Sequence, residues 1–480
     1  MNFKGGNLKE YLALALILVA ALMVRLHRID APLADWHSWR QTDTAAVTRS
    51  FVEEGIDLLH PRYEDLSSIP SGMDNPQGWR FVEFPFVNAA TAVLVQNLPM
   101  LSLEVWSRLT SIVFSLAAIL ALYLLVKRLA TMRSALLASL LFALLPYNIY
   151  YHRTVLPEVP LLFFTLAAFL FYLRWLDKNR AYDFVISWAA FAAAMLIKPY
   201  TLFIAIPMLY LAHKKWGMRL LTRPALYLLC TAIIPFLLWR LWASRFPEGI
   251  PAYTWLFNGS GIRFRPAFFR WIFAERLGKL ILGYWGLVPF AIGVIRRPLA
   301  KAGWVFHWWL FSMLVYLTIF ATGNVTHDYY QIFIIPPIAI FMAIGLEELL
   351  KPMRRTFDRR LSLIMAVVST GFGLGISWFF IRDFFNINHP EIVEAGKVAD
   401  QVLPHDAKVI APYLGDTAFL YQTKRRGWPI GGDIEKKISM GATDYVTVMK
   451  DAEVEMLLSR CKPSISIGGT TIVSLRHCSL

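Results

Sequence analysis

Long apolar runs alternate with short polar stretches over most of the chain. Three of these runs, at 11–26, 105–126 and 361–381, approach the ~20 apolar residues that a helix needs to cross a bilayer. The pattern predicts an integral membrane protein. The first run is not followed by a small-residue cleavage site, so it is expected to be a retained helix and not a removed signal peptide.

The remaining apolar runs extend this prediction to a polytopic α-helical protein with about eleven transmembrane helices. The expected spans are 11–28, 105–126, 134–150, 157–176, 182–197, 200–212, 224–243, 279–295, 303–321, 329–348 and 361–381. A large first loop, about 29–104, separates the first two spans. It contains an apolar piece at 84–98 that is too short to be a confident span.

The last hundred residues follow a different pattern. Short apolar strands such as "AKVIAP" and "DYVTV" alternate with helical patterns such as "DAEVEMLLSR". The chain is therefore expected to divide into a transmembrane module, 1–384, and a small α/β domain, 385–480.

The three cysteines fit this division. Cys461 and Cys478 flank two candidate strands joined by Gly468-Gly469, and an antiparallel pair of strands would bring them together. A disulfide is expected if the domain lies in an oxidising compartment, and two free buried thiols are the alternative. Cys230 lies inside an expected span and is interpreted as a packing residue.

The formal net charge of +15 could indicate a nucleic-acid partner, but the distribution of the charge argues against one. Lys and Arg occur in short clusters in alternate connections between apolar runs, for example at 127–133 and 351–360. Such clusters are typical of loops that stay in the cytoplasm. The N-terminus is therefore expected in the cytoplasm, and the first loop and the C-terminal domain outside it.

The sequence contains no P-loop, no HExxH, no CxxC and no Asp-x-Asp pair. An enzyme or pump driven by cytosolic nucleotides is therefore disfavoured.

The stretch "DWHSWRQTDTAAVTRSF" at 35–51 opens the first loop. Ser38 and Gln41 have the spacing of a capping box, and Gly55 could end the helix, which is expected at about 39–54. Stepping by four places Asp43 in an apolar stripe. A carboxylate there is costly unless it is paired, for which Arg40 is the expected partner, or used in catalysis.

Further ionisable residues recur at the outer ends of expected spans. They are Glu83, His152 and Arg153 with Glu158, Lys198, and His327 with Tyr329 and Tyr330 in "THDYYQ". A single aromatic or cation at such a place is typically an interfacial anchor. Their recurrence at one face predicts a polar pocket at the outer membrane boundary that could hold an anionic lipid head group and an acceptor.

Four stretches carry a resemblance: "HSWRQTDTAAVTRSF", "VEFPFVNA", "RTVLPEVPLLFF" and "HDYYQ". They resemble bacterial members of glycosyltransferase family 39 in the GT-C superfamily of membrane glycosyltransferases. That family includes protein mannosyltransferases and the aminoarabinose transferases that modify lipid A. The resemblance covers about 10–380, and "RRGW" at 425–428 resembles a segment of the outer domain of such proteins.

The resemblance implies a polyprenyl-phosphate sugar donor and a lipid, glycan or protein acceptor at the outer face of a bacterial inner membrane. It matches the catalytic acid to Asp43, although Asp35 is an alternative because the Asp-Glu pair of the mannosyltransferases is absent. Glu158 matches a second acid. The candidate phosphate partners are Arg40, Arg62, Arg153, Lys198 and His327.

The implied chemistry is a transfer that inverts the anomeric centre, with a base for the acceptor and cations for the departing phosphate. No cofactor is certain. Asp43, Glu83 and Glu158 could gather around a divalent metal, although no spacing demands one. The rival hypotheses are a secondary transporter or flippase and a non-catalytic assembly protein. Transporters place ionisable residues near the middle of the bilayer, so the outer positions favour the enzyme.

Overall fold

The computed structural model describes residues 8–222, 224–351 and 358–479. The chain forms two compact units, each assembled from separate stretches. The first comprises Met1–His27, Leu109–Leu238 and Tyr253–Asp383, and the second Arg28–Arg108, Trp239–Ala252 and Phe384–Leu480. Most of the expected first loop thus belongs with the C-terminal residues in one unit. The expected boundary at 384 between a membrane module and a domain stays a prediction.

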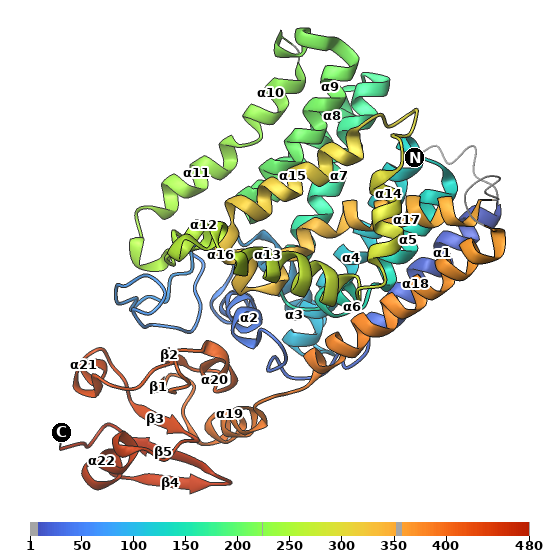
Figure 1. Ribbon diagram of the computed structural model, residues 1–480. Coiled ribbons are helices and arrows are strands. Elements are labelled where there is room, and N and C mark those ends of the chain that lie inside the picture. Colours follow the sequence, from blue (N-terminus) through green and yellow to red (C-terminus); the bar gives the residue numbers. More distant parts are fainter. Residues whose placement is uncertain (1–7, 223, 352–357, 480) are drawn as a thin grey trace. The chain divides into compact units, whose positions relative to one another are not determined.

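The first unit is helical (Figure 1). Its α-helices are α1 (Leu8–Arg25), α4 (Leu103–Leu129), α5 (Met132–Leu144), α6 (Pro146–Tyr151), α7 (Glu158–Lys178), α8 (Ala181–Ile197), α9 (Ala205–Trp216), α10 (Pro224–Thr231), α11 (Ile234–Ala243), α12 (Trp255–Asn258), α13 (Pro266–Phe269), α14 (Leu287–Ile295), α15 (Val305–Ile319), α16 (Ala321–Thr326), α17 (Ile335–Leu350) and α18 (Arg359–Ile381). Its non-α turns are η1 (Pro199–Ile204), η2 (Gly217–Thr222), η4 (Gly259–Phe264), the π-helix η5 (Arg270–Ile281), and η6 (Asp328–Ile334).

Within the described residues, four helical runs are long and apolar enough to cross a membrane: Leu103–Leu129, Glu158–Lys178, Asp328–Leu350 and Arg359–Val402. Shorter apolar helices occupy Met132–Leu144, Ala181–Ile197, Leu228–Ala243 and Val305–Ile319. The expected spans therefore coincide with helices, and the chain is an integral membrane protein. Several spans are interrupted, as between α5 and α6 at Pro146, so the count of eleven and the side of each loop stay predictions.

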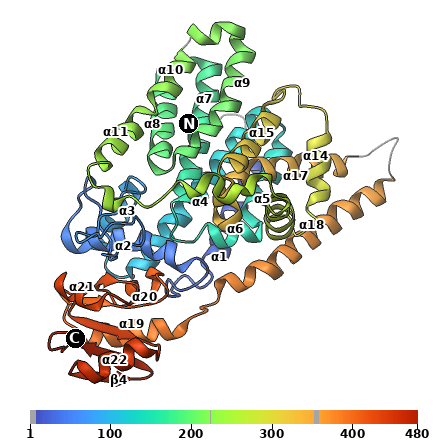
Figure 2. The same ribbon diagram turned by 60° about the vertical axis from the view of Figure 1, so that its left-hand side comes forward.

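Close helix contacts hold the first unit together where small residues face a neighbouring backbone. Helices α14 and α17 pack against each other. A Cβ added at Gly345 would lie 1.8 Å from the carbonyl oxygen of Pro289, and one at Gly293 would lie 1.9 Å from that of Phe341. Only glycine permits this approach, as in other helix pairs inside membranes. Figure 2 shows α18 as a single long helix of the same unit.

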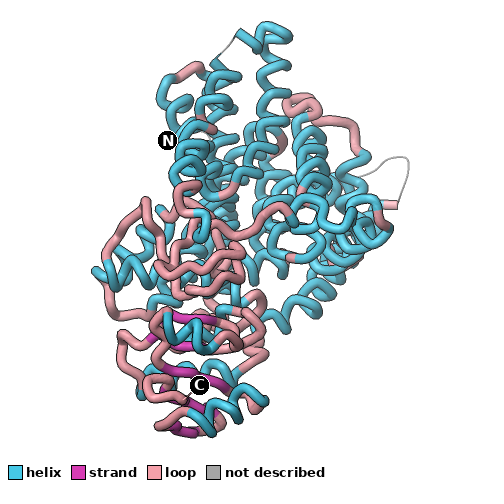
Figure 3. Tube along the Cα trace, turned by 90° about the vertical axis from the view of Figure 1, so that its left-hand side faces the viewer, coloured by secondary structure: helices cyan, strands magenta, loops and turns pink. Residues whose placement is uncertain are grey.

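The second unit combines α2 (Ser38–Glu54), α3 (Phe86–Asn97), the short turn η3 (Pro247–Gly249) and a five-stranded sheet near the C-terminus (Figure 3). The strands are β1 (Lys408–Ile410), β2 (Arg426–Trp428), β3 (Asp444–Thr447), β4 (Ser464–Ile467) and β5 (Thr470–Ser474), in the order β2-β1-β3-β5-β4. The turn η7 (Arg382–Phe385) leads into the helices of this part, α19 (Pro390–Val402), α20 (Thr417–Gln422), α21 (Ile434–Ser439) and α22 (Ala452–Arg460). The expected C-terminal α/β fold is confirmed.

Alternation along the strands builds a core on both faces of this sheet. Val409 and Val446 pack with helices α19 and α20. Their neighbours Ile410 and Tyr445 pack on the opposite face with α21 and α22. Successive residues of a strand point to opposite faces, so each strand contributes to both layers. Strand β1 is parallel to β2 and β3, whereas β5 is antiparallel to β3 and β4.

The hairpin of β4 and β5 turns at Gly468 and Gly469, both with positive φ. A disulfide joins Cys461 and Cys478 on either side of it, which confirms the expected pairing. The interpretation of Cys230 as a packing residue is wrong, because this residue is exposed on the surface of the unit.

The contact between α14 and α17 can be tested by adding one methyl group. We expect Gly345→Ala to lower the free energy of unfolding by about 1–3 kcal/mol, the usual cost of overpacking, because the new Cβ meets backbone that cannot rotate away. Gly375→Ala on α18 is the matched control, since nothing lies within 4 Å of its Cβ position. Thermal unfolding in detergent measures both. Equal stability of the two variants would contradict the packing.

Candidate functional site

The helix expected at 39–54 is α2, Ser38–Glu54, and Gly55 ends it with φ 97°. The expected capping box is wrong. His37 precedes the helix in the left-handed region, and no side chain caps the first turn. The side-chain amide of Gln41 donates to Asp35 at 2.6 Å and to the carbonyl of Trp36 at 3.1 Å.

Asp43 is buried on α2 and is held from two sides. Its Oδ2 accepts from Arg80 Nη2 at 2.6 Å, and its Oδ1 accepts from the hydroxyl of Thr417 at 2.7 Å. The guanidinium of Arg80 also lies 4.8 Å from the centre of the Tyr63 ring. A buried carboxylate needs such partners, because an uncompensated charge in the interior is expensive.

The expected ion pair between Asp43 and Arg40 is wrong. Arg40 forms a salt bridge with Glu83 instead, and both side chains are largely buried. Arg40 and Asp43 are three residues apart on the helix, but each finds an oppositely charged partner on the loop that follows α2. The structure thus brings four of the charged residues of this region into two pairs, Asp43–Arg80 and Arg40–Glu83.

Two further acids influence the Asp43 region. Burial raises the pKa of Asp65 to about 6, and the nearby charge of Asp43 contributes to this rise. The hydrogen bond that the Ser67 backbone N–H donates to the Asp65 carboxylate acts in the opposite direction and lowers the pKa. Burial also raises the pKa of Asp416 to about 6, again with a contribution from the charge of Asp43. Asp43 therefore lies near two other acids, and Arg80 is its direct counter-charge.

Asp35 is a structural residue of the loop entry. Besides Gln41, its carboxylate meets Arg108 at 3.8 Å, and both side chains are almost fully buried. Arg108 in turn donates to the carbonyl of Ile29 at 2.9 Å and to that of Ala31. These contacts fix the chain where it enters the second unit.

Arg62 has its own partners within this unit. It pairs with Glu54 at 3.0 Å, and its guanidinium lies 4.6 Å from the Trp79 ring. One third of its side chain is exposed. Its role as a phosphate partner stays a prediction.

Sequence reasoning missed Arg80, Thr417 and a buried cluster around Arg49. Arg49 donates to Glu64 at 2.6 Å, lies 3.6 Å from Glu104 and stacks on the Tyr421 ring at 3.8 Å. The one available signal was that "TRSF" places Arg49 among buried positions of α2. A charge there requires a partner, but nothing in the spacing identifies which one.

The first unit contains a second charged cluster. Lys198, at the end of α8, forms a salt bridge with Glu158 at the start of α7. Its Nζ lies 5.0 Å from the ring centre of Tyr330 and 5.7 Å from that of Tyr329. Oε2 of Glu158 is buried and accepts no hydrogen bond from the residues that the structure describes.

The aromatic pair beside Lys198 is internal. Tyr329 and Tyr330 are 2% and 8% exposed, so they are not interfacial anchors. His327 stacks on Tyr329 with ring centres 5.4 Å apart and meets the Trp255 ring edge-on at 5.7 Å. The structure therefore gathers Glu158, Lys198, Tyr329, Tyr330 and His327 into one aromatic and charged cluster. Their role in binding a substrate stays a prediction.

Asp328 anchors the same segment. Its carboxylate accepts from the hydroxyl of Tyr151 at 2.5 Å and lies 3.5 Å from Arg276. The hydroxyl of Tyr147 donates to its backbone carbonyl, also at 2.5 Å. Sequence reasoning gave Asp328 no role, and these contacts assign it to holding "HDYYQ" against α6.

His152 and Arg153 are both buried at the end of α6. His152 Nδ1 lies 3.0 Å from the hydroxyl of Ser115, and its ring packs edge-on against Phe142. These contacts hold the His152 ring inside the helical unit, and its role in substrate binding stays a prediction. Arg153 precedes the α7 helix that begins at Glu158.

No group of three His, Cys, Asp or Glu side chains in the described parts of the chain is arranged to hold a metal ion. Asp43 and Glu83 each have an arginine partner, and Glu158 has a lysine. The residues that were considered for a divalent metal are thus arranged as acid–cation pairs.

Comparison with known proteins supports this fold. Residues 85–242 match a protein family described as dolichyl-phosphate-mannose-protein mannosyltransferase. These residues are less than half of the chain. No curated protein sequence matches.

Solved structures match over nearly the whole chain. ArnT from Cupriavidus metallidurans bound to undecaprenyl phosphate has a TM-score of 0.69 at 14% identity, covering 97% of this chain and 99% of that one. The apo oligosaccharyltransferase of Archaeoglobus fulgidus has a TM-score of 0.57 at 12% identity, covering 95% and 71%. The same archaeal enzyme with an inhibitory peptide and a dolichol-phosphate has a TM-score of 0.56 at 11% identity, covering 92% and 70%. The resemblance to GT-C glycosyltransferases is confirmed, and the chain has their fold.

The raised pKa of Asp65 makes the stability of the second unit depend on pH. Its folded-state pKa of about 6 lies above the usual 3.8, so protonation favours the folded state. This contribution is complete below pH 3.8 and is lost as the pH rises through about 6. We expect the Asp65→Asn variant not to show this loss, so that the change in its free energy of unfolding with pH differs from that of the wild type by at most about 3 kcal/mol.

Thermal unfolding of both proteins at pH 4.5 and pH 7.5 measures this difference. The wild type should lose stability relative to Asp65→Asn at the higher pH. Parallel changes in the two proteins would show that Asp65 titrates normally.

Proposed function

We propose that the chain transfers a glycosyl group from a polyprenyl-phosphate-linked donor to an acceptor at the outer face of the membrane, with Asp43 as the base. The observation that carries the proposal is a carboxylate that is 5% exposed and is oriented by Arg80 and Thr417. It lies within "HSWRQTDTAAVTRSF", one of the four stretches that carry the resemblance to the glycosyltransferases. The whole-chain likeness to an undecaprenyl-phosphate-bound ArnT supports the donor class.

The proposed reaction needs few protein groups. The acceptor hydroxyl or amine attacks the anomeric carbon of the donor sugar. The bond between that carbon and the phosphate oxygen breaks, and polyprenyl phosphate leaves. The acceptor proton passes to Asp43. Each carboxylate oxygen has two acceptor positions, so an oxygen that already binds Arg80 or Thr417 can still accept this proton. Attack opposite the phosphate inverts the anomeric centre.

We propose separately that the Lys198 cluster of the first unit binds the donor phosphate. Lys198 supplies a positive charge in a setting that is mostly aromatic, where a charge-assisted hydrogen bond is strong. Arg153 and His327 are further candidates for this contact, and Tyr329 and Tyr330 form the wall beside it. Oε2 of Glu158, which no described residue engages, would accept a hydroxyl of the donor sugar.

Neutralising the Asp43–Arg80 pair tests the base. Asp43→Asn alone leaves Arg80 buried without its counter-charge, so a loss of activity could reflect a loss of folding. We therefore expect the double variant Asp43→Asn with Arg80→Gln to unfold near the wild-type temperature while transfer falls by about 10²–10⁴-fold. Asp43→Glu, which keeps the charge but moves the carboxylate, should also be stable and slow.

Transfer of labelled sugar from a polyprenyl-phosphate donor in detergent measures the rate, and a transporter would not catalyse it at all. The control is Asp35→Asn, which should affect stability more than turnover. Full activity of the double variant would rule out Asp43 as the base.

A second prediction concerns Lys198. We expect Lys198→Gln to raise the KM for the donor about 10–100-fold, the equivalent of one hydrogen bond to a charged group, with a smaller change in kcat. Lys178→Ala, which removes an exposed lysine at the end of α7, is the control and should leave KM unchanged. An unchanged KM in Lys198→Gln, measured with thermally stable protein, would place the phosphate elsewhere.

A further inference from the structure

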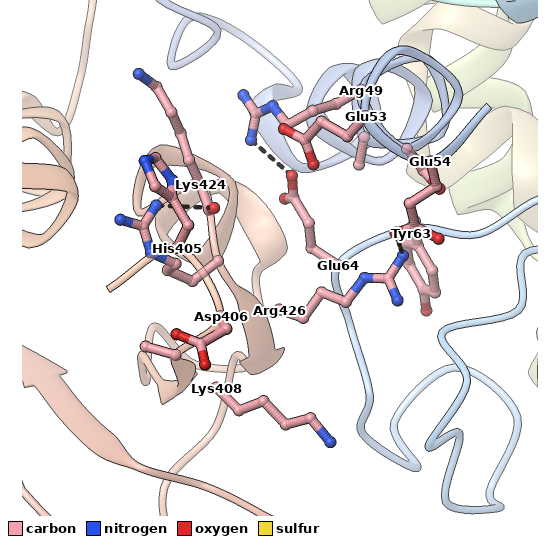
Figure 4. A pocket seen from close by; sticks show the side chains of 14 residues that line it. Arg49, Glu53, Glu54, Tyr63, Glu64, His405, Asp406, Lys408, Lys424 and Arg426 are labelled. Atoms are coloured by element: carbon pink, nitrogen blue, oxygen red, sulfur yellow. Dashed lines mark hydrogen bonds and ion pairs between the residues drawn. The ribbon is translucent and has the colours of Figure 1, made fainter. Parts of the chain in front are cut away.

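The second unit contains a polar pocket of about 240 Å³ that the proposed chemistry does not use (Figure 4). The end of α2 and the loop after it form one wall, and the segments leading to β1 and β2 form the other. Its charged and aromatic lining consists of Arg49, Glu53, Glu54, Tyr63 and Glu64 from the first wall and His405, Asp406, Lys408, Lys424, Arg425 and Arg426 from the second.

Ion pairs fix part of this lining. Arg49 donates to Glu64 at 2.6 Å, and Arg426 forms a salt bridge with Glu54. Arg425 is buried and pairs with Asp400 at 2.9 Å. These pairs link the two walls or anchor one of them, so the pocket has a preformed shape.

The rim differs from these paired groups. Glu53 and Asp406 form no hydrogen bond or ion pair with any residue that the structure describes, and both are exposed. The ammonium of Lys408 contacts the carbonyl of Met440 at 3.4 Å and no described carboxylate. Residues with acceptor groups and a residue with a donor group therefore line the same small pocket without pairing with each other.

This mixture selects among ligand classes. An apolar ligand is disfavoured because the lining is mostly charged. A polyanion is disfavoured because Glu53 and Asp406 would repel it and because Arg49 and Arg426 already have counter-charges. A carboxylate only accepts hydrogen bonds and an ammonium only donates them, whereas a sugar hydroxyl does both. A polyhydroxylated ligand satisfies both kinds of group.

The size points the same way. Pockets for drug-sized ligands are usually about 300–1,000 Å³, so this smaller one suits a single sugar ring. It also borders the Asp43 region inside the same unit. Tyr63 lines the pocket and lies under Arg80, and Ala46 follows Asp43 by one turn of α2.

We propose that this pocket is a saccharide subsite that holds one sugar unit of the acceptor, so that the acceptor is a glycan or glycolipid. That the bound sugar belongs to the acceptor rests on the proposed glycosyl transfer, whereas the binding of a sugar to this pocket does not. Glu53 and Asp406 accept hydrogen bonds from the sugar hydroxyls, and Lys408 donates one.

Binding can be measured without any donor. Saturation-transfer NMR on the purified full-length protein would use glucose, glucosamine and glucuronate as probes, with inorganic phosphate and a serine-rich peptide as alternatives. We expect at least one hexose to bind and its affinity to fall tenfold or more in the double variant Asp406→Asn with Lys408→Gln. The matched control is Glu394→Gln with Lys397→Gln, an exposed acid–lysine pair on α19, which should bind as the wild type does.

The outcomes separate this inference from the proposed function. Absence of hexose binding, equal binding by both double variants, or binding of phosphate or peptide alone would overturn the saccharide subsite, whatever the transfer assay shows. Hexose binding that the pocket variant loses, in a protein that transfers no sugar, would support the subsite and reject the glycosyl transfer. With an active enzyme, the pocket variant should raise the KM for a glycan acceptor tenfold and leave the KM for the donor unchanged.

Discussion

The buried ion pair between Asp43 and Arg80 is the interaction on which the second unit depends. It joins α2 to a loop position 37 residues later, and the hydroxyl of Thr417 extends it to α20, 374 residues after Asp43. Each charge would be costly alone in this interior, so the three segments must come together for the carboxylate to be buried at all. The catalytic proposal uses the same carboxylate because its orientation is fixed before any substrate arrives.

Helix α2 repeats this arrangement along its length. Arg40 reaches Glu83, Asp43 reaches Arg80, and Arg49 reaches Glu64 and Tyr421. Eleven of its residues are buried, yet they include four charged or amide side chains, Arg40, Gln41, Asp43 and Arg49. Hydrogen bonds and ion pairs therefore position α2 more than a continuous apolar face does. They explain why so polar a helix is buried.

Local patterns predicted much of this architecture. The bounds of α2, the apolar helices, the C-terminal sheet and the Cys461–Cys478 disulfide all follow from periodicity, turn residues and spacing. They also predicted that Asp43 is buried and needs a partner. The partner itself could not be predicted, because Arg40 at one turn's distance and Arg80 in the next segment satisfy the same electrostatic requirement. Likewise, the capping-box pattern could not show that Asp35 binds Gln41.

The two charged clusters solve the burial of charge in different ways, and the difference bears on their chemistry. In the second unit, arginines provide planar donors that orient carboxylates, a geometry suited to holding a base in one direction. In the first unit, Lys198 pairs with Glu158 and lies beside the aromatic rings of Tyr329 and Tyr330. An ammonium is a compact point charge, a form of cation that proteins commonly use to bind phosphate. The residue type at each position thus matches the role proposed for it, a directed base in one unit and an anion contact in the other.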